Sequence, residues 1–370
     1  MRVQKKKLCD ICFPKQWKTI SSDSLQDSGY PVYGANGIIG FYSEYNHEKK
    51  TLLITCRGAT CGSLNICEPY SYVNGNAMAL DNLSEEIDIQ YLFYYLQYRG
   101  FSDVITGSAQ PQIVRNSLEK IYVFYPEITQ QKKICDTLDK VCDLIALRRK
   151  QLERLDLMVK ARFVEMFGDP VQNPYNWCVV NMAELGNCKN GMNFHTEDSG
   201  IDIFCLGVGD FKNLAYITDT TKLPLISLNR LPSEEYLLKD GDIVFVRSNG
   251  NKDLVGRSLL VYPGNVPTTF SGFCIRFRLQ SDKVQTDYLL MVLKSEAIRK
   301  MMVGRGANIQ NLNQKILSEL VIPVPPLEKQ KRFSLFFSQV DKLKLPIQRS
   351  LDTLEVLKKS LMQEYFGQGV

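Results

Sequence analysis

Cysteines are the residues with the most distinctive chemistry in this sequence, which has eleven of them among 370 residues. Cys9 and Cys12 form a C-x-x-C pair, so a zinc site has to be weighed. A closed zinc site needs four convergent sulfur or nitrogen ligands, usually supplied as two spaced pairs. No second cysteine pair has that spacing, and the only histidines are His47 and His195. We therefore expect free thiols in a reducing cytoplasm, most of them small core residues, and no bound metal.

Two segments are similar to parts of a methyltransferase site. Residues 202–209 read Asp-Ile-Phe-Cys-Leu-Gly-Val-Gly, like a strand and glycine loop that bind adenosylmethionine, but the spacing is one residue too long. No third glycine opens a helix after it, and Gly-x-Gly alone is a weak signal. Asn173-Pro174-Tyr175 is similar to the Asn-Pro-Pro-Tyr loop that holds a flipped adenine, but the second proline is missing. We interpret the tripeptide as a turn and predict no cofactor on this chain.

Other catalytic patterns are also missing from the sequence. It contains no Walker A segment, so ATP-driven work is not expected of this chain. No pair of carboxylates around a lysine has a nuclease-like arrangement, and neither histidine has a nucleophile nearby in sequence. The sequence therefore predicts a protein without catalysis of its own.

Polar loops punctuated by glycine offer a binding chemistry instead. Residues 57–60 follow a β-prone run and residues 106–112 precede one, while 247–252 and 304–311 are the corresponding loops of the second half. Arginine can bond guanine O6 and N7, and asparagine or glutamine can bond adenine N6 and N7. The alternative is that these loops are capped turns that stabilise the fold. We predict DNA contacts for Arg57, Thr60, Ser108, Gln110, Gln112, Arg115, Arg247, Asn249, Asn251, Lys252, Arg305, Asn308 and Gln310.

Composition is compatible with a nucleic-acid partner. The apolar fraction of 44% and the charged fraction of 23% are typical of a globular protein. The net charge of +5 permits a polyanionic partner without implying a strongly basic tail. The length suits two domains with connecting elements, and no apolar run is long enough to predict a membrane span.

The chain is a long internal repeat. Residues 107–168 align with residues 306–367 without a gap, at a constant offset of 199 residues. Leu118 falls on Leu317, Pro126 on Pro325, Gln131 on Gln330, and Glu165 on Glu364. Upstream the similarity is weaker: Tyr91-Leu92 matches Tyr288-Leu289, and 52–57 resembles 243–247 with Arg57 on Arg247. Two copies alone exclude a solenoid and imply a pseudo-twofold molecule.

Each copy ends in a predicted long helix with a heptad pattern of apolar residues. The seam, which we also assign to partner docking, comprises Ile134, Leu138, Val141, Leu152, Leu155, Val340, Ile347, Leu351 and Leu354. A helix of about forty residues is about 60 Å long, more than one domain of this size can cover. We therefore expect the two helices to pair in antiparallel orientation, the alternative being that each packs on its own domain.

Proline and glycine mark irregularities and ends of these helices. Pro346 lies inside the second helix, and Lys344 and Lys358 occupy seam positions, so this helix is expected to bend or loosen. Gly168 and Gly367 are expected to end the helices in the left-handed conformation.

The fold class is α+β: two similar mixed α/β domains joined by two long antiparallel coiled-coil-like helices. Leu52 to Thr55 is predicted to be a short buried strand, and Tyr91 to Tyr98 an amphipathic helix. The predicted division is a first domain over 1–126, a helix over 127–168, a second domain over 169–325 and a helix over 326–368.

The sequence resembles the specificity-subunit family of type I restriction–modification enzymes. The resemblance rests on residues 30–40, 107–113, 126–133 and 163–170, in that order, together with the duplication. It implies that each domain is a target-recognition domain for one half of a bipartite, asymmetric double-stranded DNA site. It also implies that the helices set the gap between the half-sites.

The same resemblance implies a set of partners. Two methyltransferase subunits would dock on the helices, bind S-adenosylmethionine and methylate adenine, and a restriction subunit would add ATP- and Mg-dependent translocation and cleavage. Two alternatives stay open: a specificity subunit for a type II-like methyltransferase–nuclease fusion, or a duplicated scaffold that binds protein. Neighbouring genes would identify the first, and salt-dependent, sequence-specific DNA binding would exclude the second.

Overall fold

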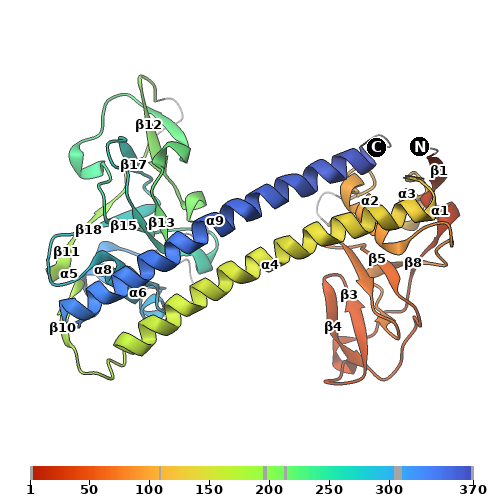
Figure 1. Cartoon of the computed structure of the whole chain (residues 1–370), viewed down its shortest axis with the longest axis horizontal. Coiled ribbons are helices and arrows are strands. Elements are labelled where there is room, and N and C mark those ends of the chain that lie inside the picture. Colours follow the sequence, from red (N-terminus) through yellow and green to blue (C-terminus); the bar gives the residue numbers. More distant parts are fainter. Residues whose placement is uncertain (1–2, 108–109, 195–197, 212–214, 304–310, 368–370) are drawn as a thin grey trace. The chain divides into compact units, whose positions relative to one another are not determined.

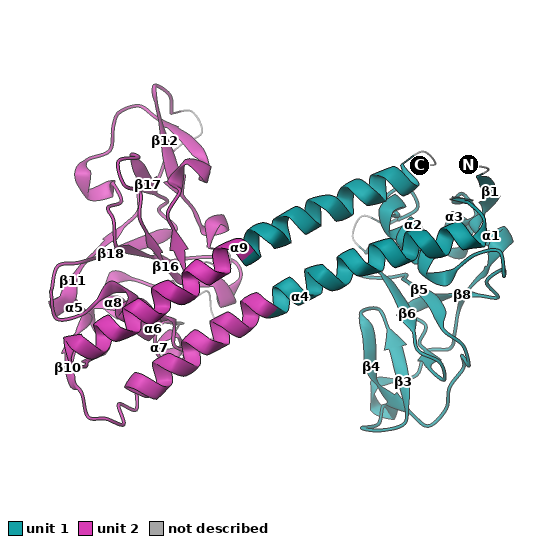
Figure 2. Cartoon of the chain, in the orientation of Figure 1, with its two compact units in different colours: residues 1–150, 347–370 teal, residues 151–346 magenta. Residues whose placement is uncertain are grey.

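The computed structural model describes residues 3–107, 110–194, 198–211, 215–303 and 311–367, and the chain forms two compact units. Unit 1 contains residues 1–150 and 347–370, and unit 2 contains residues 151–346 (Figure 2). The boundary falls within both long helices, α4 (Ile128–Phe167) and α9 (Leu327–Phe366), which Figure 1 shows in yellow and in blue. Each unit therefore contains a piece of both helices, whereas the sequence predicted separate helical segments.

Unit 1 combines three small sheets with one substantial helix of its own. The sheets have the strand orders β2-β8-β5-β6, β4-β3-β7 and β1-β9, with parallel pairing at β3–β7. The strands are β1 (Gln4–Lys7), β2 (Phe13–Gln16), β3 (Tyr30–Gly34), β4 (Gly37–Tyr42), β5 (Thr51–Thr55), β6 (Leu64–Cys67), β7 (Tyr72–Val73), β8 (Ala77–Asp81) and β9 (Tyr122–Tyr125). The helices are α1 (Leu8–Ile11), α2 (Ile89–Arg99) and α3 (Arg115–Leu118). Strand β5 and helix α2 confirm the two elements predicted for this half.

Unit 2 repeats this plan with one added strand. Its sheets are β11-β18-β15-β16-β13, β14-β12-β17 and β10-β19, with parallel pairing at β12–β17 and β13–β16. The strands are β10 (Cys178–Asn181), β11 (Gly186–Asn190), β12 (Ile201–Leu206), β13 (Tyr216–Ile217), β14 (Leu225–Leu228), β15 (Asp242–Val246), β16 (Ser258–Val261), β17 (Thr268–Phe270), β18 (Cys274–Leu279) and β19 (Val321–Val324). The helices are α5 (Met182–Leu185), α6 (Thr286–Lys294), α7 (Glu296–Val303) and α8 (Gln314–Ser318). The duplication seen in the sequence therefore extends to the order of strands in all three sheets.

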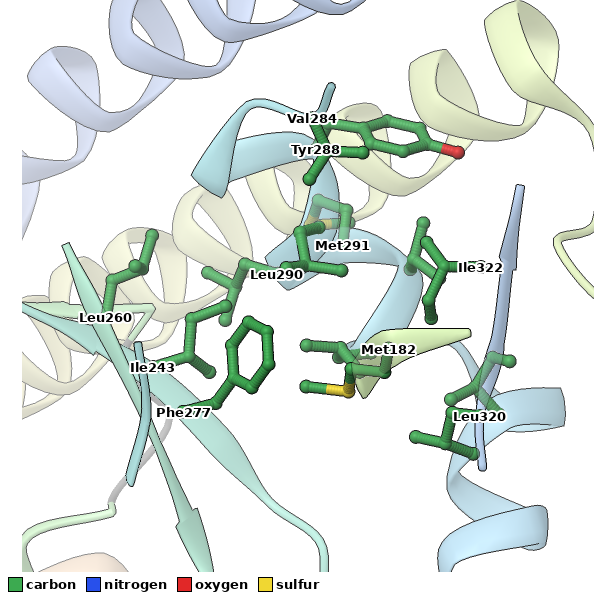
Figure 3. Close-up of a cluster of buried hydrophobic side chains, with 14 of the residues drawn as sticks. Met182, Ile243, Leu260, Phe277, Val284, Tyr288, Leu290, Met291, Leu320 and Ile322 are labelled. Atoms are coloured by element: carbon green, nitrogen blue, oxygen red, sulfur yellow. The ribbon is translucent and has the colours of Figure 1, made fainter. Parts of the chain in front are cut away.

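The main core of unit 2 lies between the five-stranded sheet and helix α6. Ile243, Leu260 and Phe277 come from the sheet, and Leu290 comes from α6 (Figure 3). Phe163 of α4 and Phe333 of α9 join the same core, with ring centroids 5.5 Å apart. Unit 1 has the equivalent arrangement, in which Phe366 of α9 packs against Tyr91 of α2 at 5.5 Å.

A buried glutamine fastens each long helix to its domain. Gln131 is fully buried, donates to the carbonyl of Pro126 and accepts a hydrogen bond from the amide of Asp88. Gln330 makes the corresponding bonds with Pro325 and with the amide of Gln285. A buried amide is costly unless its donors and acceptors are paired, so these glutamines fix where each helix begins.

The helices also pair with each other within each unit. In unit 1 the guanidinium of Arg148 donates to the hydroxyl of Ser350 at 3.2 Å. In unit 2 Lys344 forms an ion pair with Asp156, so this seam lysine has a partner on the facing helix. Within unit 2, Asp156 contacts Lys344 and Phe163 contacts Phe333, so residue numbers run in opposite directions along α4 and α9, which confirms the antiparallel arrangement. Packing on the adjacent domain, the alternative weighed from sequence, occurs as well.

The predictions for the glycines that end the two helices have different outcomes. Gly168 has a φ of 76° and its amide donates to the carbonyl of Val164, which confirms a left-handed stop. Gly367 lies outside the left-handed region, so the corresponding prediction for α9 is wrong, and its amide simply continues the pattern by donating to Gln363. Pro346 lies within α9, which continues through it as one helix.

The cysteines are free thiols, and six of them are buried. In the described part of the chain, no three histidine, cysteine or acidic side chains gather as a metal site requires. None of the helices described is both long and apolar enough to span a membrane.

Lys294 gives unit 2 a specific pH dependence. Burial lowers its pKa from 10.5 to about 8, with Lys344, Lys160 and Arg257 acting in the same direction and Asp156 opposing them. Because the folded pKa is below the unfolded one, protonated Lys294 costs stability at neutral pH, and this cost disappears as pH rises from 8 to 10.5. We expect Lys294→Met to stabilise unit 2 by about 2 kcal/mol at pH 7, and by much less at pH 10. Denaturant unfolding followed by the fluorescence of Trp177 in a Trp17→Phe background would measure this.

The control for this experiment is Lys300→Met on helix α7. Lys300 forms an exposed ion pair with Glu296 and should change stability little at either pH. An equal effect of Lys294→Met at pH 7 and pH 10 would contradict the assignment of the cost to the charge of Lys294.

Candidate nucleic-acid interface

Three loops of unit 1 meet beside the end of strand β5. The amide of Cys56, directly after β5, donates to the carbonyl of Asn76 at 3.1 Å. The carbonyl of Cys56 accepts a hydrogen bond from the amide of Ile113 at 3.0 Å, and the amide of Gly58 donates to Pro111 at 3.1 Å. The loop after β5, the turn before β8 and the segment that leads into α3 are therefore one hydrogen-bonded cluster, the unit 1 loop cluster.

Unit 2 builds the same cluster from the corresponding segments. The amide of Arg247 donates to the carbonyl of Phe273 at 2.8 Å, and the amide of Leu312 donates to the carbonyl of Arg247 at 2.9 Å. We call these segments the unit 2 loop cluster. Arg247 thus occupies the place of Cys56, not that of Arg57, so the sequence-based pairing of the two arginines is wrong by one residue. The two arginines follow their strands at different distances, because Arg247 directly follows β15 whereas Arg57 is the second residue after β5.

Five predicted DNA contacts of unit 1 are exposed polar residues at or near its loop cluster. They are Arg57, Thr60, Gln110, Gln112 and Arg115, of which Arg57 and Gln112 face each other in an isolated β-bridge. The guanidinium of Arg115 lies 4.0 Å from the ring of Phe13, so the side chain has a defined direction. Ser108 lies outside the described residues.

The predicted contacts of unit 2 are less uniform. Arg247 is half-buried and its Nη1 donates to the carbonyl of Gly272 at 3.2 Å. The side-chain oxygens of Asn249 and Asn251 accept hydrogen bonds from backbone amides two residues further along the chain. These two asparagines therefore cap the turn, which agrees with the alternative that these loops are capped turns that stabilise the fold. Lys252 begins a short 3-10 helix, Lys252–Leu254, and Arg305, Asn308 and Gln310 lie outside the described residues.

Arginines supply positive charge next to the unit 2 loop cluster. Arg257 and Arg299 both donate to the backbone oxygen of Asp253, so these two cations are held against the loop. Desolvation by burial, together with the positive charge of Arg257, lowers the pKa of Arg299 below its ordinary value, although an arginine so placed stays charged at neutral pH. A polyanion that approaches this loop would meet fixed positive charge.

The glycine loop at 207–209, the turn at 173–175 and His47 are each held by hydrogen bonds within the fold. The loop at Gly207 leads into a 3-10 turn, Val208–Asp210, and the carboxylate of Asp210 accepts a hydrogen bond from the amide of Gly207. The side chain of Asn173 bonds both the amide and the carbonyl of Trp177, which confirms the turn. His47 is buried, with its ring nitrogens 2.6 Å from the Asn46 amide oxygen and 2.9 Å from the Asp81 carboxylate. His195 lies outside the described residues.

Sequence reasoning missed Asn76 and Phe273, the exposed residues at the centre of the two clusters. The signal was present in the repeat: the turns Asn74-Gly75-Asn76 and Ser271-Gly272-Phe273 precede β8 and β18 at an offset of 197 residues. The Tyr91–Tyr288 match has the same offset, so these turns align with it without a gap.

Comparison with known proteins agrees with this architecture. The family model for the type I restriction modification DNA specificity domain matches residues 2–157 and 174–355. The StySPI specificity subunit of Salmonella potsdam is 24% identical over 332 residues, 84% of this chain and 68% of that protein. The EcoKI specificity subunit of Escherichia coli K12 is 20% identical over 294 residues, 72% of this chain and 61% of that protein.

A solved structure shows the same fold. The S subunit of a type I restriction–modification system from M. genitalium superposes with a TM-score of 0.61 at 15% identity, covering 98% of this chain and 95% of that one. The duplicated units, the two long helices and the match of the family model to both halves agree with one another. The chain belongs to the DNA-specificity subunits of type I restriction–modification enzymes.

Proposed function

We propose that each unit reads one half of a bipartite, asymmetric double-stranded DNA site. The observation that supports this most directly is the pair of loop clusters, which share one backbone hydrogen-bond pattern but differ in their side chains. Cys56 is replaced by Arg247 and Asn76 by Phe273, at backbone positions that are otherwise equivalent. Two readers built on one scaffold but with different polar and apolar groups would recognise two different sequences.

The long helices are proposed to set the gap between the half-sites. Their seam residues are buried or half-buried, and none of the nine predicted from sequence is exposed. A continuous paired seam would stiffen the two helices, as a ruler requires.

Partner docking is proposed for the outer faces of the helices, because buried seam residues cannot meet a partner directly. Apolar side chains are exposed on these faces at Leu144, Leu147, Leu157, Met158 and Val164 of α4 and at Leu335, Leu343, Leu345, Val356 and Leu357 of α9. Within unit 2 the two helices also form a groove of about 590 Å³, lined by residues that include Met158 and Phe336. Exposed apolar side chains on a charged helix are typical of a surface that a partner covers.

The partners we propose are two methyltransferase subunits on the helices and a restriction subunit that translocates and cleaves DNA. S-adenosylmethionine, magnesium and ATP would bind to those subunits, and this chain would act in the cytoplasm as their non-catalytic specificity element. Two observations support this division of roles: the polar loops occur in both halves of the chain, and the sequence lacks a Walker A segment and has only incomplete methyltransferase motifs.

Mapping methylated adenines tests the proposal. The chain is expressed with its methyltransferase partner in a host that lacks adenine methylation, and N6-methyladenine is located across the genome. We expect one asymmetric motif with two specified parts and an unspecified gap. Absence of any sequence-specific methylation, with the complex intact, would overturn DNA reading by this chain.

The docking surface predicts a separate effect of Val356, whose side chain is 67% exposed on α9. Val356→Glu would place a charge in an apolar contact, so we expect methyltransferase binding to weaken about tenfold or more. Isothermal titration with the purified partner measures this. Leu225→Glu, at a residue 58% exposed on β14, is the matched control and should bind normally. Equal binding by both variants would exclude Val356 from the docking surface.

A further inference from the structure

The residue directly before β8 and the residue directly before β18 occupy the same backbone site in the two units. The carbonyl of Asn76 accepts from the amide of Cys56, and the carbonyl of Phe273 accepts from the amide of Arg247. The strands that follow, β8 and β18, are equivalent in their sheets, since each lies between β5 and β2 or between β15 and β11. Asn76 and Phe273 are therefore the same position in two copies of one reader.

Both side chains point into solvent from a turn that is otherwise buried. Phe273 is 62% exposed, although Cys274 next to it is fully buried. Asn76 is exposed between the buried residues Gly75 and Ala77. A single exposed apolar residue is ordinary on a protein surface. The position of Phe273 is the informative feature, because Phe273 lies at the centre of the unit 2 loop cluster and is equivalent to the polar residue Asn76 of unit 1.

Glycines let these turns pack closely against neighbouring chain. A Cβ at Gly272 would clash with the side-chain oxygen of Asn193, and a Cβ at Gly75 would clash with Thr19. The backbone that presents Phe273 and Asn76 is therefore held between its own sheet and the segment after β11 or β2. Because this backbone is already ordered, a side chain on it can contact a partner without the loss of conformational entropy that ordering a flexible loop would cause.

Each turn is also fastened by a polar side chain. The carbonyl of Gly75 accepts a hydrogen bond from Nε2 of Gln16 at 3.2 Å, and the carbonyl of Gly272 accepts one from Nη1 of Arg247 at 3.2 Å. Gln16 and Arg247 thus act as positioning residues for the turn. Arg247 also brings a positive charge next to Phe273, which would favour a negatively charged partner such as DNA.

We propose that this shared position is a base-reading position in each unit, with Asn76 bonding N6 and N7 of an adenine and Phe273 packing against the 5-methyl group of a thymine. Asparagine matches the donor–acceptor pair of adenine in the major groove, and an apolar side chain can distinguish thymine by its methyl group. The inference rests on the proposed function, namely that each unit reads one half-site, and it adds which residue reads which base chemistry.

Base analogues in the DNA test this assignment. Once the methylated motif is mapped, the intact complex with its methyltransferase is titrated with duplexes in which single thymines of the unit 2 half-site are replaced by uracil. The loss of one methyl contact should weaken binding about fourfold at one thymine. In the Phe273→Ala complex the same replacement should have no further effect, because the contact is already gone.

The unit 1 position is tested in parallel with 7-deazaadenine, which lacks the N7 acceptor. We expect binding to weaken about tenfold at one adenine of the unit 1 half-site, and the Asn76→Ala complex to be insensitive to this replacement. Leu225→Ala and Gln97→Ala, at an exposed leucine of unit 2 and an exposed amide on α2, are matched controls that should keep the sensitivity of the unaltered complex.

The outcomes separate this inference from the proposed function. If the complex binds and methylates a bipartite motif but Phe273→Ala stays sensitive to uracil, the reading role of Phe273 is wrong while half-site reading stands. The same holds for Asn76 and 7-deazaadenine. Uniform weakening on all sequences would instead make the residue a structural one and would overturn the inference. Absence of any specific motif would overturn the proposed function itself.

Discussion

A chain whose residues 1–126 are replaced by a second copy of residues 175–325 is expected to specify a symmetric DNA site. The two ends of the exchanged segments are equivalent, because Gln4 pairs with Tyr125 where Cys178 pairs with Val324. Both halves of the site would then be read by the same loop cluster, so the half-site of unit 1 should disappear completely. Adenine-methylation mapping of the chimera with its methyltransferase partner measures this directly.

The helices should accept the exchanged segment because their contacts to the two units correspond. Phe366 packs on Tyr91 in unit 1 at 5.5 Å, and Phe167 packs on Tyr288 in unit 2 at 4.8 Å. Gln131 and Gln330 fasten the two helices through equivalent backbone groups, the carbonyls of Pro126 and Pro325 and the amides of Asp88 and Gln285. The exchanged segment would therefore contact the two helices much as it does in its native unit.

The reciprocal chimera is the control for this prediction. Replacing residues 175–325 by a copy of residues 1–126 should give the other symmetric site, built from the lost half of the first chimera. A chimera that folds and methylates but keeps an asymmetric motif would show that half-site reading does not belong to these segments.

Lengthening both helices together is expected to lengthen the unspecified gap. Seven residues would be inserted after Lys150 in α4 and seven after Pro346 in α9, because the unit boundary crosses the helices there. A heptad keeps the seam facing the same way and adds about 10.5 Å of helix. Since base pairs are stacked about 3.4 Å apart, the gap should grow by about 3 base pairs. Methylation mapping of the variant gives the gap directly.

A single insertion in α4 is the control for the paired one. It would shift part of α4 out of register with α9. The hydrogen bond between Arg148 and Ser350 and the ion pair between Asp156 and Lys344 could then not form at the same time. We expect this variant to lose stability and methylation together. A paired insertion that methylates the original motif with an unchanged gap would exclude the helices as the ruler.

Much of the architecture was predictable because it depends on local pattern. The heptad repeat of α4 and α9 shows directly in the spacing of apolar residues, and β5 and α2 follow from short apolar runs. The duplication was visible because the downstream half of each copy keeps a constant register. These features need no information about distant parts of the chain.

Other features depend on contacts that no local pattern encodes. The sequence shows that the helices have an apolar stripe, but not that Phe366 completes the core of the first unit. The left-handed stop predicted at Gly367 failed because glycine permits that conformation without requiring it. In the candidate site, exposed polar residues were found readily, but Phe273 was missed because an aromatic residue before a strand is typical of a core.

Construction of unit 1 from two separated segments has a consequence for synthesis on the ribosome. Residues 1–150 emerge first, but Met362 and Phe366, which belong to their core, emerge only after all of unit 2 (151–346). At the ~5–20 residues per second of translation this interval lasts about 10–40 s. During that time Tyr91 and Tyr95 lack the aromatic partner that covers them in the finished protein. The unit that is second along the chain can therefore complete its core before the first one does, and the nascent first unit has an apolar face that chaperones can bind.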